Sequence, residues 1–282
     1  MNFQGKKTNQ TGAALLIVIM ITAIMSIIMT LMLHQSRLDM KLAALVKQRT
    51  NSELALQTAQ STFVYKAMTS PLHLVGPTFT EIDLEYEPIV SDFKNTVSKD
   101  GPISISVQDM AGMVSLLPYD EKNLFRLLIQ NGYTDDMLFS FKDRLEDWQD
   151  GDSLTRLQGK EIGDYENYPF FPSNMLLQTV NELAYLIEPT VFNDIKKWLV
   201  LYGQGDINRQ FTPEALYSAA GITITNSKEY ADPNDGEFVY PSGRYLVTLS
   251  FNEHDISLSK EFLLIRGQDT FQPFFIVNEK IF

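Results

Sequence analysis

A long stretch without glycine or proline constrains this chain more than any other feature. Between Ala13 and Ser70, 58 consecutive residues lack both of the residue types that most readily interrupt a helix. One continuous helix over this stretch would be roughly 87 Å long at about 1.5 Å per residue. The sequence therefore predicts a single long helix over residues 13–70, followed by a globular part.

The first part of this helix suits a membrane. No charged residue occurs between Ala13 and Leu33, and those residues would span roughly 31 Å, close to the hydrocarbon thickness of a bilayer. Only Thr22, Ser26 and Thr30 are polar, and their hydroxyls can bond back to the helix backbone. We predict a transmembrane helix over residues 13–33.

The helix becomes amphipathic beyond the membrane, over residues 34–70. Apolar residues recur there at steps of three and four: Leu38, Leu42, Leu45, Leu56, Ala59 and Phe63. Such a stripe needs a surface to pack on. We expect a helix half in the membrane and half packed on its own globular head; the alternative is a plain single-pass anchor with a juxtamembrane helix.

A short basic leader precedes the apolar run. Lys6 and Lys7 are followed by Gly12 at the start of the helix. A secretory signal has a shorter apolar region of about 7–15 residues with a cleavage site behind it, and the residues after Leu33 offer none. The candidate cut therefore lies between Gly12 and Ala13.

Charge gives an orientation and excludes some partners. Basic residues before the apolar run and an acidic bulk after it place the N-terminus in the cytoplasm and the head outside. The net charge is −12, and loss of Lys6 and Lys7 with the leader would make it more negative. Nucleic acid is therefore disfavoured as a partner. The absence of cysteine excludes disulfides, thiol catalysis and cysteine-bound metals.

The rest of the chain alternates between strand and helix patterns. Ile103–Val107 reads as a strand, and a second strand ending at Leu117 would complete a hairpin. Four helical segments are predicted next: Glu121–Gln130, Asp135–Asp147, Asn174–Leu186 and Pro189–Leu201. Strand patterns return in Gly243–Phe251, Asp255–Arg266 and Pro273–Asn278, with a hairpin turn at Asn252–Asp255.

These blocks predict an α+β fold with a nested layout. Residues 71–119 and 221–282 would form the head, in which an antiparallel sheet packs on the long helix. Residues 120–220 would form an inserted all-helical domain whose short helices resemble SAM-like domains. The alternative is two domains in series, which would leave the hairpin of residues 103–117 isolated and only marginally stable.

An acidic segment in the helical block invites a metal. Five carboxylates lie within eighteen residues: Asp147, Asp150, Asp152, Glu161 and Asp164. Hard oxygen ligands in a glycine-containing loop suit Ca²⁺ better than Zn²⁺ or Cu²⁺. The spacing departs from the EF-hand template because Leu154 stands where a ligand should follow. The alternative is a solvated acidic loop with helix caps.

No sequence pattern points to catalysis. The three histidines, His34, His73 and His254, lie in no recognisable catalytic order, and there is no P-loop, GxSxG or HExxH motif. We expect no enzyme; a membrane-anchored hydrolase using Asp147 and Glu161 is the least favoured alternative. Trp148 and Trp198 are expected in the core.

The leader and helix resemble those of type IV pilins and type II secretion pseudopilins. In those families a prepilin peptidase cuts after the glycine and the new N-terminus is methylated, which implies cleavage between Gly12 and Ala13 and methylation of Ala13. Most members carry Glu at the fifth mature position, where this chain has Ile17. The general secretion pathway protein K family of minor pseudopilins shares that departure.

The helical block resembles the same family. Its similar segments are Leu145–Asp152 with an Asp-Trp-x-Asp-x-Asp pattern, Gly159–Glu161 with Tyr165, Val180–Leu183, and Ile207-Asn208 with Thr212-Pro213. Two segments depart from it, Ser115–Leu117 and Arg209–Phe211. Because relatives bind calcium in this domain, the resemblance implies a Ca²⁺ site, for which Asp150, Asp152, Glu161 and Asp164 are the candidate ligands.

The resemblance also implies a function. A member of the protein K family would be held in the bacterial inner membrane, contacting its lipid, with the head in the periplasm. It would form the tip of the pseudopilus with I-type and J-type minor pseudopilins, initiate assembly at the inner-membrane platform and support export across the outer membrane. The alternatives are a minor pilin of a type IV pilus or competence system, and a membrane-anchored periplasmic binding module.

Overall fold

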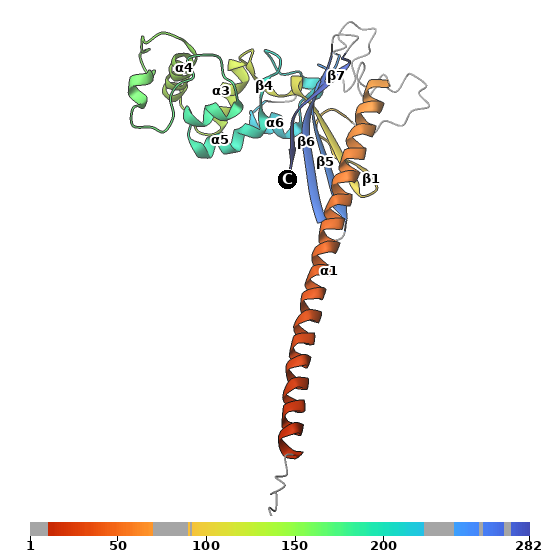
Figure 1. Cartoon of the computed structure of the whole chain (residues 1–282). Helices are drawn as coiled ribbons and strands as arrows, with labels where there is room; N and C mark the ends of the chain where they lie inside the picture. The colour runs from red at the N-terminus through yellow and green to blue at the C-terminus, as the bar shows by residue number, and fades with distance from the viewer. Residues whose placement is uncertain (1–10, 70–89, 91, 223–239, 254–255, 268–271) are drawn as a thin grey trace, which may run out of the picture. The chain divides into compact units, whose positions relative to one another are not determined.

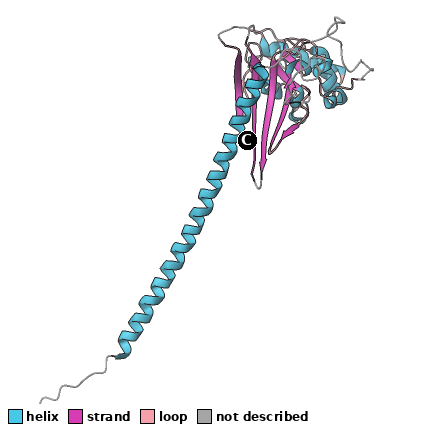
Figure 2. Cartoon of the chain, turned by 90° about the vertical axis from the view of Figure 1, so that its right-hand side faces the viewer, coloured by secondary structure: helices cyan, strands magenta, loops and turns pink. Residues whose placement is uncertain are grey.

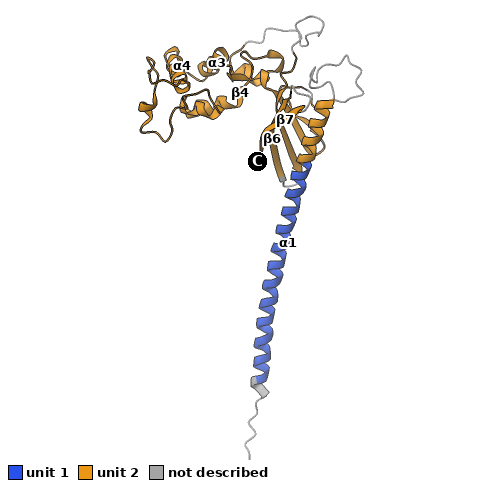
Figure 3. Ribbon diagram, turned by 45° about the horizontal axis from the view of Figure 1, so that its top comes forward, with its two compact units in different colours: residues 1–55 blue, residues 56–282 orange. Residues whose placement is uncertain are grey.

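The computed structural model describes residues 11–69, 90, 92–222, 240–253, 256–267 and 272–282. It divides into two units, Met1–Ala55 and Leu56–Phe282, which Figure 3 colours separately. The predicted turn residues 254–255 and the predicted helix end at Ser70 lie outside the described residues.

The long helix is confirmed as α1 (Thr11–Thr69). From Ala14 onward it is long and apolar enough to cross a membrane, with a mean hydropathy of 2.8 in its apolar window. The hydroxyls of Thr22, Ser26 and Thr30 bond to backbone carbonyls three or four residues earlier, at 2.8–2.9 Å. These side chains are thus satisfied within the helix, as their position in an apolar segment requires.

A five-stranded antiparallel sheet forms the centre of the second unit (Figures 1 and 2). Its strands, in spatial order, are β1 (Ser98–Asp100), β2 (Ile103–Asp109), β5 (Arg244–Glu253), β6 (Ile256–Arg266) and β7 (Phe274–Ile281). The three C-terminal strands are where the alternation predicts them. β2 pairs directly with β5, although the whole helical block lies between these two strands in the sequence.

The C-terminal turns of α1 pack on this sheet. Leu56 and Phe63 are buried, as the apolar stripe predicts, whereas Leu38, Leu42 and Leu45 of the same stripe are exposed. Alternate residues of β5 are buried, from Tyr245 to Phe251. A polar link accompanies the apolar contact: Lys260 Nζ on β6 lies 3.4 Å from Gln57 Oε1 on α1.

The predicted hairpin of residues 103–117 is wrong. β3 (Val114–Leu117) pairs in parallel with β4 (Leu199–Tyr202), far along the chain, and not with β2. The 3₁₀ turn η1 (Met110–Gly112) redirects the chain between them. The carboxylate of Asp109 holds this turn, accepting hydrogen bonds from the Ala111 and Ser242 amides at 2.8 Å each.

The block between the strands is mainly, but not entirely, helical. Its helices are α3 (Glu121–Gln130), α4 (Asp135–Gln149), η2 (Ile162–Tyr165), η3 (Val180–Tyr185), α5 (Pro189–Ile195), η4 (Lys196–Trp198), η5 (Arg209–Phe211) and α6 (Glu214–Ala219). The first two match the predicted segments closely. The expectation of an all-helical block is corrected by β4, which replaces the end of the predicted helix Pro189–Leu201.

The predicted helix Asn174–Leu186 is also shorter in the structure. Only η3 forms there. The Glu182 carboxylate accepts hydrogen bonds from the amides of Gln178 and Thr179, at 2.7 and 2.8 Å. Glu182 thus caps the N-terminus of η3, which begins at Val180. The helix therefore starts later than the sequence pattern predicts.

Leucines and aromatic residues fill the core of the helical block. Leu124, Leu127, Leu128, Phe141, Leu145 and Trp148 are among its buried members. Trp198 packs against this core and is half-buried, so both tryptophans contribute to it as predicted. The packing of α4 into this core fixes the position of its C-terminal end, where the acidic segment begins.

Candidate metal site

The site begins at the last turn of α4. Asp147 lies within this helix and is completely buried, while Asp150 directly follows its end and is half-buried. Residues three apart are neighbours on a helix surface, so the two carboxylates lie on the same side of the helix end. Asp147 stands between the buried residues Leu145 and Trp148, which is why its side chain is turned inward.

A third carboxylate joins them from the following loop. One oxygen from each of Asp147, Asp150 and Glu161 lies within 4.8 Å of the others. Calcium binds oxygen at about 2.3–2.6 Å, so two ligands of one ion lie at most about 5 Å apart. The spacing of the three carboxylates therefore fits a single calcium ion.

Glu161 has no cationic partner among the described residues. The side chain is 5% exposed and faces the backbone amides at the start of η2, but neither of its oxygens accepts a hydrogen bond of ordinary geometry. Burial raises the pKa of this carboxyl, and repulsion from Asp147, Asp150 and Asp152 raises it further. Asp150 Oδ1 is buried and unpaired as well. Buried polar atoms without good partners are rare in native proteins, so these oxygens are candidate ligands for a cation.

Arg156 supplies the positive charge that the structure does contain. Its Nη1 lies 2.5 Å from Asp147 Oδ1 and 2.5 Å from Asp150 Oδ2, and its Nε lies 2.8 Å from Glu146 Oε2. Three carboxylates thus contact one guanidinium, and an oxygen of Glu161 lies within 4.8 Å of oxygens of two of them, Asp147 and Asp150. Arg156 cannot balance this charge, and a divalent cation would bring the cluster much closer to neutrality.

The loop that carries Glu161 needs a glycine two residues earlier. A Cβ on Gly159 would lie 1.8 Å from Asp147 Oδ2. The amide of Arg156 also donates a hydrogen bond to that oxygen, at 3.2 Å. Close contact between this loop and Asp147 thus explains the glycine of the Gly159–Glu161 segment in physical terms.

The structure brings together part of the predicted ligand set. Asp150 and Glu161 belong to the cluster, whereas Asp152 and Asp164 are exposed and bond to backbone amides, of Leu154 at 2.8 Å and of Glu161 at 3.0 Å. The predicted set omits Asp147. Its position on the apolar face of α4, next to a buried tryptophan, was the sequence signal for a buried carboxylate.

The other predicted site lies at the start of the chain. Gly12 and Ala13 fall in the first turn of α1, and the structure carries no information on cleavage. His34 is exposed, and the other two histidines lie outside the described residues.

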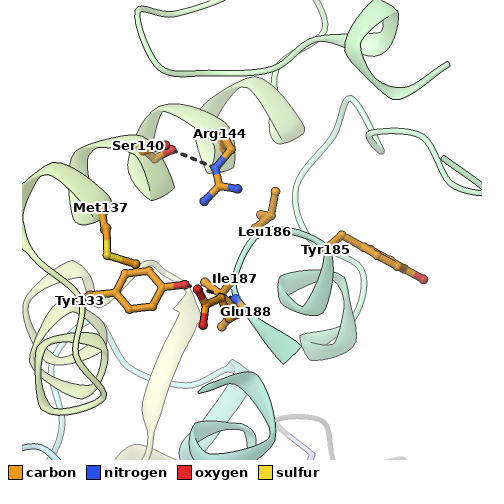
Figure 4. Close-up of a pocket in the computed structure, with 8 residues that line it drawn as sticks. All are labelled: Tyr133, Met137, Ser140, Arg144, Tyr185, Leu186, Ile187 and Glu188. Atoms are coloured by element: carbon orange, nitrogen blue, oxygen red, sulfur yellow. Dashed lines mark hydrogen bonds between the residues drawn. The ribbon is translucent and has the colours of Figure 1, made fainter. Parts of the chain in front are cut away.

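A small pocket opens beside α4 (Figure 4). It has a volume of about 300 Å³, and Tyr133, Arg144 and Tyr185 are among its lining residues. Arg144 Nε donates to Ser140 O within its own helix at 3.2 Å. Among the described residues no carboxylate forms an ion pair with Arg144, in contrast to Arg156.

Comparison by sequence gives no relative: no protein family and no curated protein matches the chain. Comparison by structure gives a likeness of fold. The fold is similar to a chain in the crystal structure of the GspK-GspI-GspJ complex from the type 2 secretion system of enterotoxigenic Escherichia coli. The TM-score is 0.54 at 14% sequence identity, and the match covers 83% of this chain and 99% of the solved one. The chain therefore has a GspK-like, pilin-like α+β fold.

Proposed function

We propose that this chain is a minor pseudopilin of a type II secretion system, similar to protein K. The observation that carries the proposal is the extent of the structural likeness, which covers 99% of the solved chain. In this chain the neighbouring strands β2 and β5 are separated in sequence by a helical block. Fold alone does not determine function, so the N-terminal sequence is a second, independent support.

The N-terminal helix supplies the membrane part of the proposal. Residues 13–33 hold the subunit in the inner membrane by a single pass, with the leader in the cytoplasm and the head in the periplasm. A prepilin peptidase removes the leader after Gly12, and Ala13 becomes the methylated N-terminus. The chain is not an enzyme in this proposal.

The position in the filament follows from Ile17. A Glu at this position would pair with the N-terminal ammonium of a subunit ahead, since an unpaired charge in an apolar bundle is costly. A subunit with Ile at this position suits the filament tip, where no subunit lies ahead. There it packs with I-type and J-type minor pseudopilins, initiates assembly on the inner-membrane platform and supports protein export.

Calcium is a further part of the proposal. Asp147, Asp150 and Glu161 would hold the ion, and Asp152 adds negative charge nearby. Bound calcium would neutralise the carboxylates and join the loop of residues 150–161 to α4. Its role in the proposal is structural, to stabilise the helical block.

Copurification from membranes tests the assignment. The chain is tagged at its C-terminus and coexpressed with the I-type and J-type pseudopilins of its own secretion system. We expect a stable complex with both, and accumulation of secreted proteins in the periplasm of a deletion strain. Capture of type IV pilus subunits instead, with secretion intact, would replace the proposal by a minor pilin.

A further inference from the structure

Arg156 occupies the position between two of the three candidate calcium ligands. Its Nη1 lies 2.5 Å from an oxygen of Asp147 and 2.5 Å from an oxygen of Asp150. Calcium would need oxygens of the same two carboxylates, at about 2.3–2.6 Å. A guanidinium and a divalent ion on the same pair of carboxylates repel strongly at such short distances.

We infer that Arg156 is a built-in counter-ion which calcium must displace, so that this side chain sets how tightly the cluster binds the ion. The inference rests on the calcium site proposed above. Without calcium, the guanidinium reduces repulsion among the carboxylates and holds the loop against α4. With calcium, the ion takes over both tasks and Arg156 leaves the two aspartates.

The surroundings of Arg156 provide a path for this exchange. The side chain is 35% exposed, and its Nε is paired with Glu146, whose side chain is 45% exposed. The guanidinium can therefore turn toward Glu146 and solvent without opening the core. The backbone amide of Arg156 keeps its hydrogen bond to Asp147 Oδ2, so the loop remains attached to the helix while the side chain moves.

Glu161 explains why the exchange favours calcium when the ion is present. Both of its buried oxygens lack a hydrogen bond of ordinary geometry among the described residues, and Arg156 forms no ion pair with it there. Calcium would bind all three carboxylates, whereas the guanidinium contacts only two of them.

The test is a calcium titration of the full-length chain in detergent. Calorimetry and the fluorescence of Trp148, which adjoins Asp147, report the binding. We expect Arg156→Gln to lower the calcium dissociation constant by at least about tenfold. In chelator the same variant should melt below the wild type, and in saturating calcium the difference should largely disappear. Arg144→Gln is the matched control. It also removes one arginine charge, but Arg144 lies on α4 and forms no ion pair among the described residues. It should change the dissociation constant less than about threefold.

Arg156→Lys provides a second test, which also serves if Arg156→Gln does not fold. The lysine ammonium keeps the charge but lacks the planar guanidinium that contacts Glu146, Asp147 and Asp150. The calcium dissociation constant of Arg156→Lys should therefore lie below that of the wild type and above that of Arg156→Gln. Unchanged or weaker calcium binding in folded Arg156 variants would overturn the inference and leave the calcium site intact. No calcium binding by the wild type or any variant would overturn both, while copurification would still test the pseudopilin assignment separately.

Discussion

Glu161 is the residue whose surroundings most need a cation. It is buried beside two aspartates, and its pKa is raised for that reason. Replacement of this carboxyl by an amide should therefore remove the calcium response without damaging the core. In chelator, Glu161→Gln should melt at or slightly above the wild-type temperature, because it relieves repulsion within the cluster.

A calcium melting experiment checks this expectation. At a calcium concentration about one hundred times the dissociation constant, binding stabilises a folded protein by about 2.7 kcal/mol. For a domain of this size, that corresponds to a rise in melting temperature of about 5–10 °C. The rise should be absent in Glu161→Gln and retained in Asp164→Asn, which keeps the acceptor for the Glu161 amide and lies outside the cluster. A wild type that melts at the same temperature in calcium and in chelator would contradict the site.

Gly159 tests the packing of the loop. A methyl group there would overlap Asp147 Oδ2, so Gly159→Ala should destabilise the chain by about 1–3 kcal/mol and weaken calcium binding. Gly163→Ala is the control, because no other atom lies within 4 Å of the Cβ position at Gly163. Its effect should stay within about 0.5 kcal/mol. Thermal unfolding in detergent measures both, and equal effects would show that the loop does not pack as described.

Among the secondary-structure elements, α1, β6 and β7 are joined by the side chain of Lys260. It lies on the buried face of β6, between Leu258 and Phe262, and its side chain is 2% exposed. Its Nζ lies 2.8 Å from Glu279 Oε1 on β7 and 3.4 Å from Gln57 Oε1 on α1. This cation therefore fixes the C-terminal turns of α1 and strand β7 to the same strand.

Replacement of Glu279 and replacement of Lys260 should change the free energy of unfolding by different amounts. Glu279→Ala leaves a buried ammonium without its charge partner and should cost about 1–3 kcal/mol. Lys260→Met replaces the buried cation with an apolar chain of similar length and should be neutral within about 1 kcal/mol. Lys280→Ala, an exposed neighbour on β7, serves as the control. Equal losses of stability in Glu279→Ala and Lys260→Met would contradict the proposed role of the ion pair.

The same ion pair gives a pH dependence. The hydrogen bond from Lys260 lowers the pKa of Glu279 below its ordinary value of 4.5. A carboxyl with a lowered pKa in the folded state stabilises the fold above its unfolded pKa, and this contribution is lost as the pH falls through the folded value. The melting temperatures of the wild type and Glu279→Ala should therefore approach each other as the pH falls below 4.5 and meet below the folded pKa of Glu279. A constant difference down to that pH would count against the ion pair.

Local patterns predicted the elements better than their pairing. The boundaries of α3 and the positions of β5 and β6 follow from periodicity and turn residues in the sequence. The partner of β3 does not, because Val114–Leu117 pairs with a strand more than eighty residues away. The same limit applies to the metal site. Chain order places Asp147, Asp152 and Asp164 all near Asp150, whereas the folded positions of α4 and its following loop show which of them share the cluster.

At the scale of the whole molecule, two features that differ in kind support one assignment. The fold is GspK-like over 83% of the chain at 14% identity, where sequence comparison gives no relative. The basic leader, Gly12 and the apolar start of α1 come from the sequence alone. The proposed pseudopilin role requires both, since only a processed N-terminal helix can enter a filament with its neighbours.

The most direct test of the central proposal is the mass of the N-terminus. The chain would be extracted from membranes of cells with and without the prepilin peptidase and analysed by mass spectrometry. The account predicts a chain that begins at methylated Ala13 when the peptidase is present, and the intact leader when it is absent. An intact Met1 in both strains, or a cut beyond Leu33, would contradict the pseudopilin assignment.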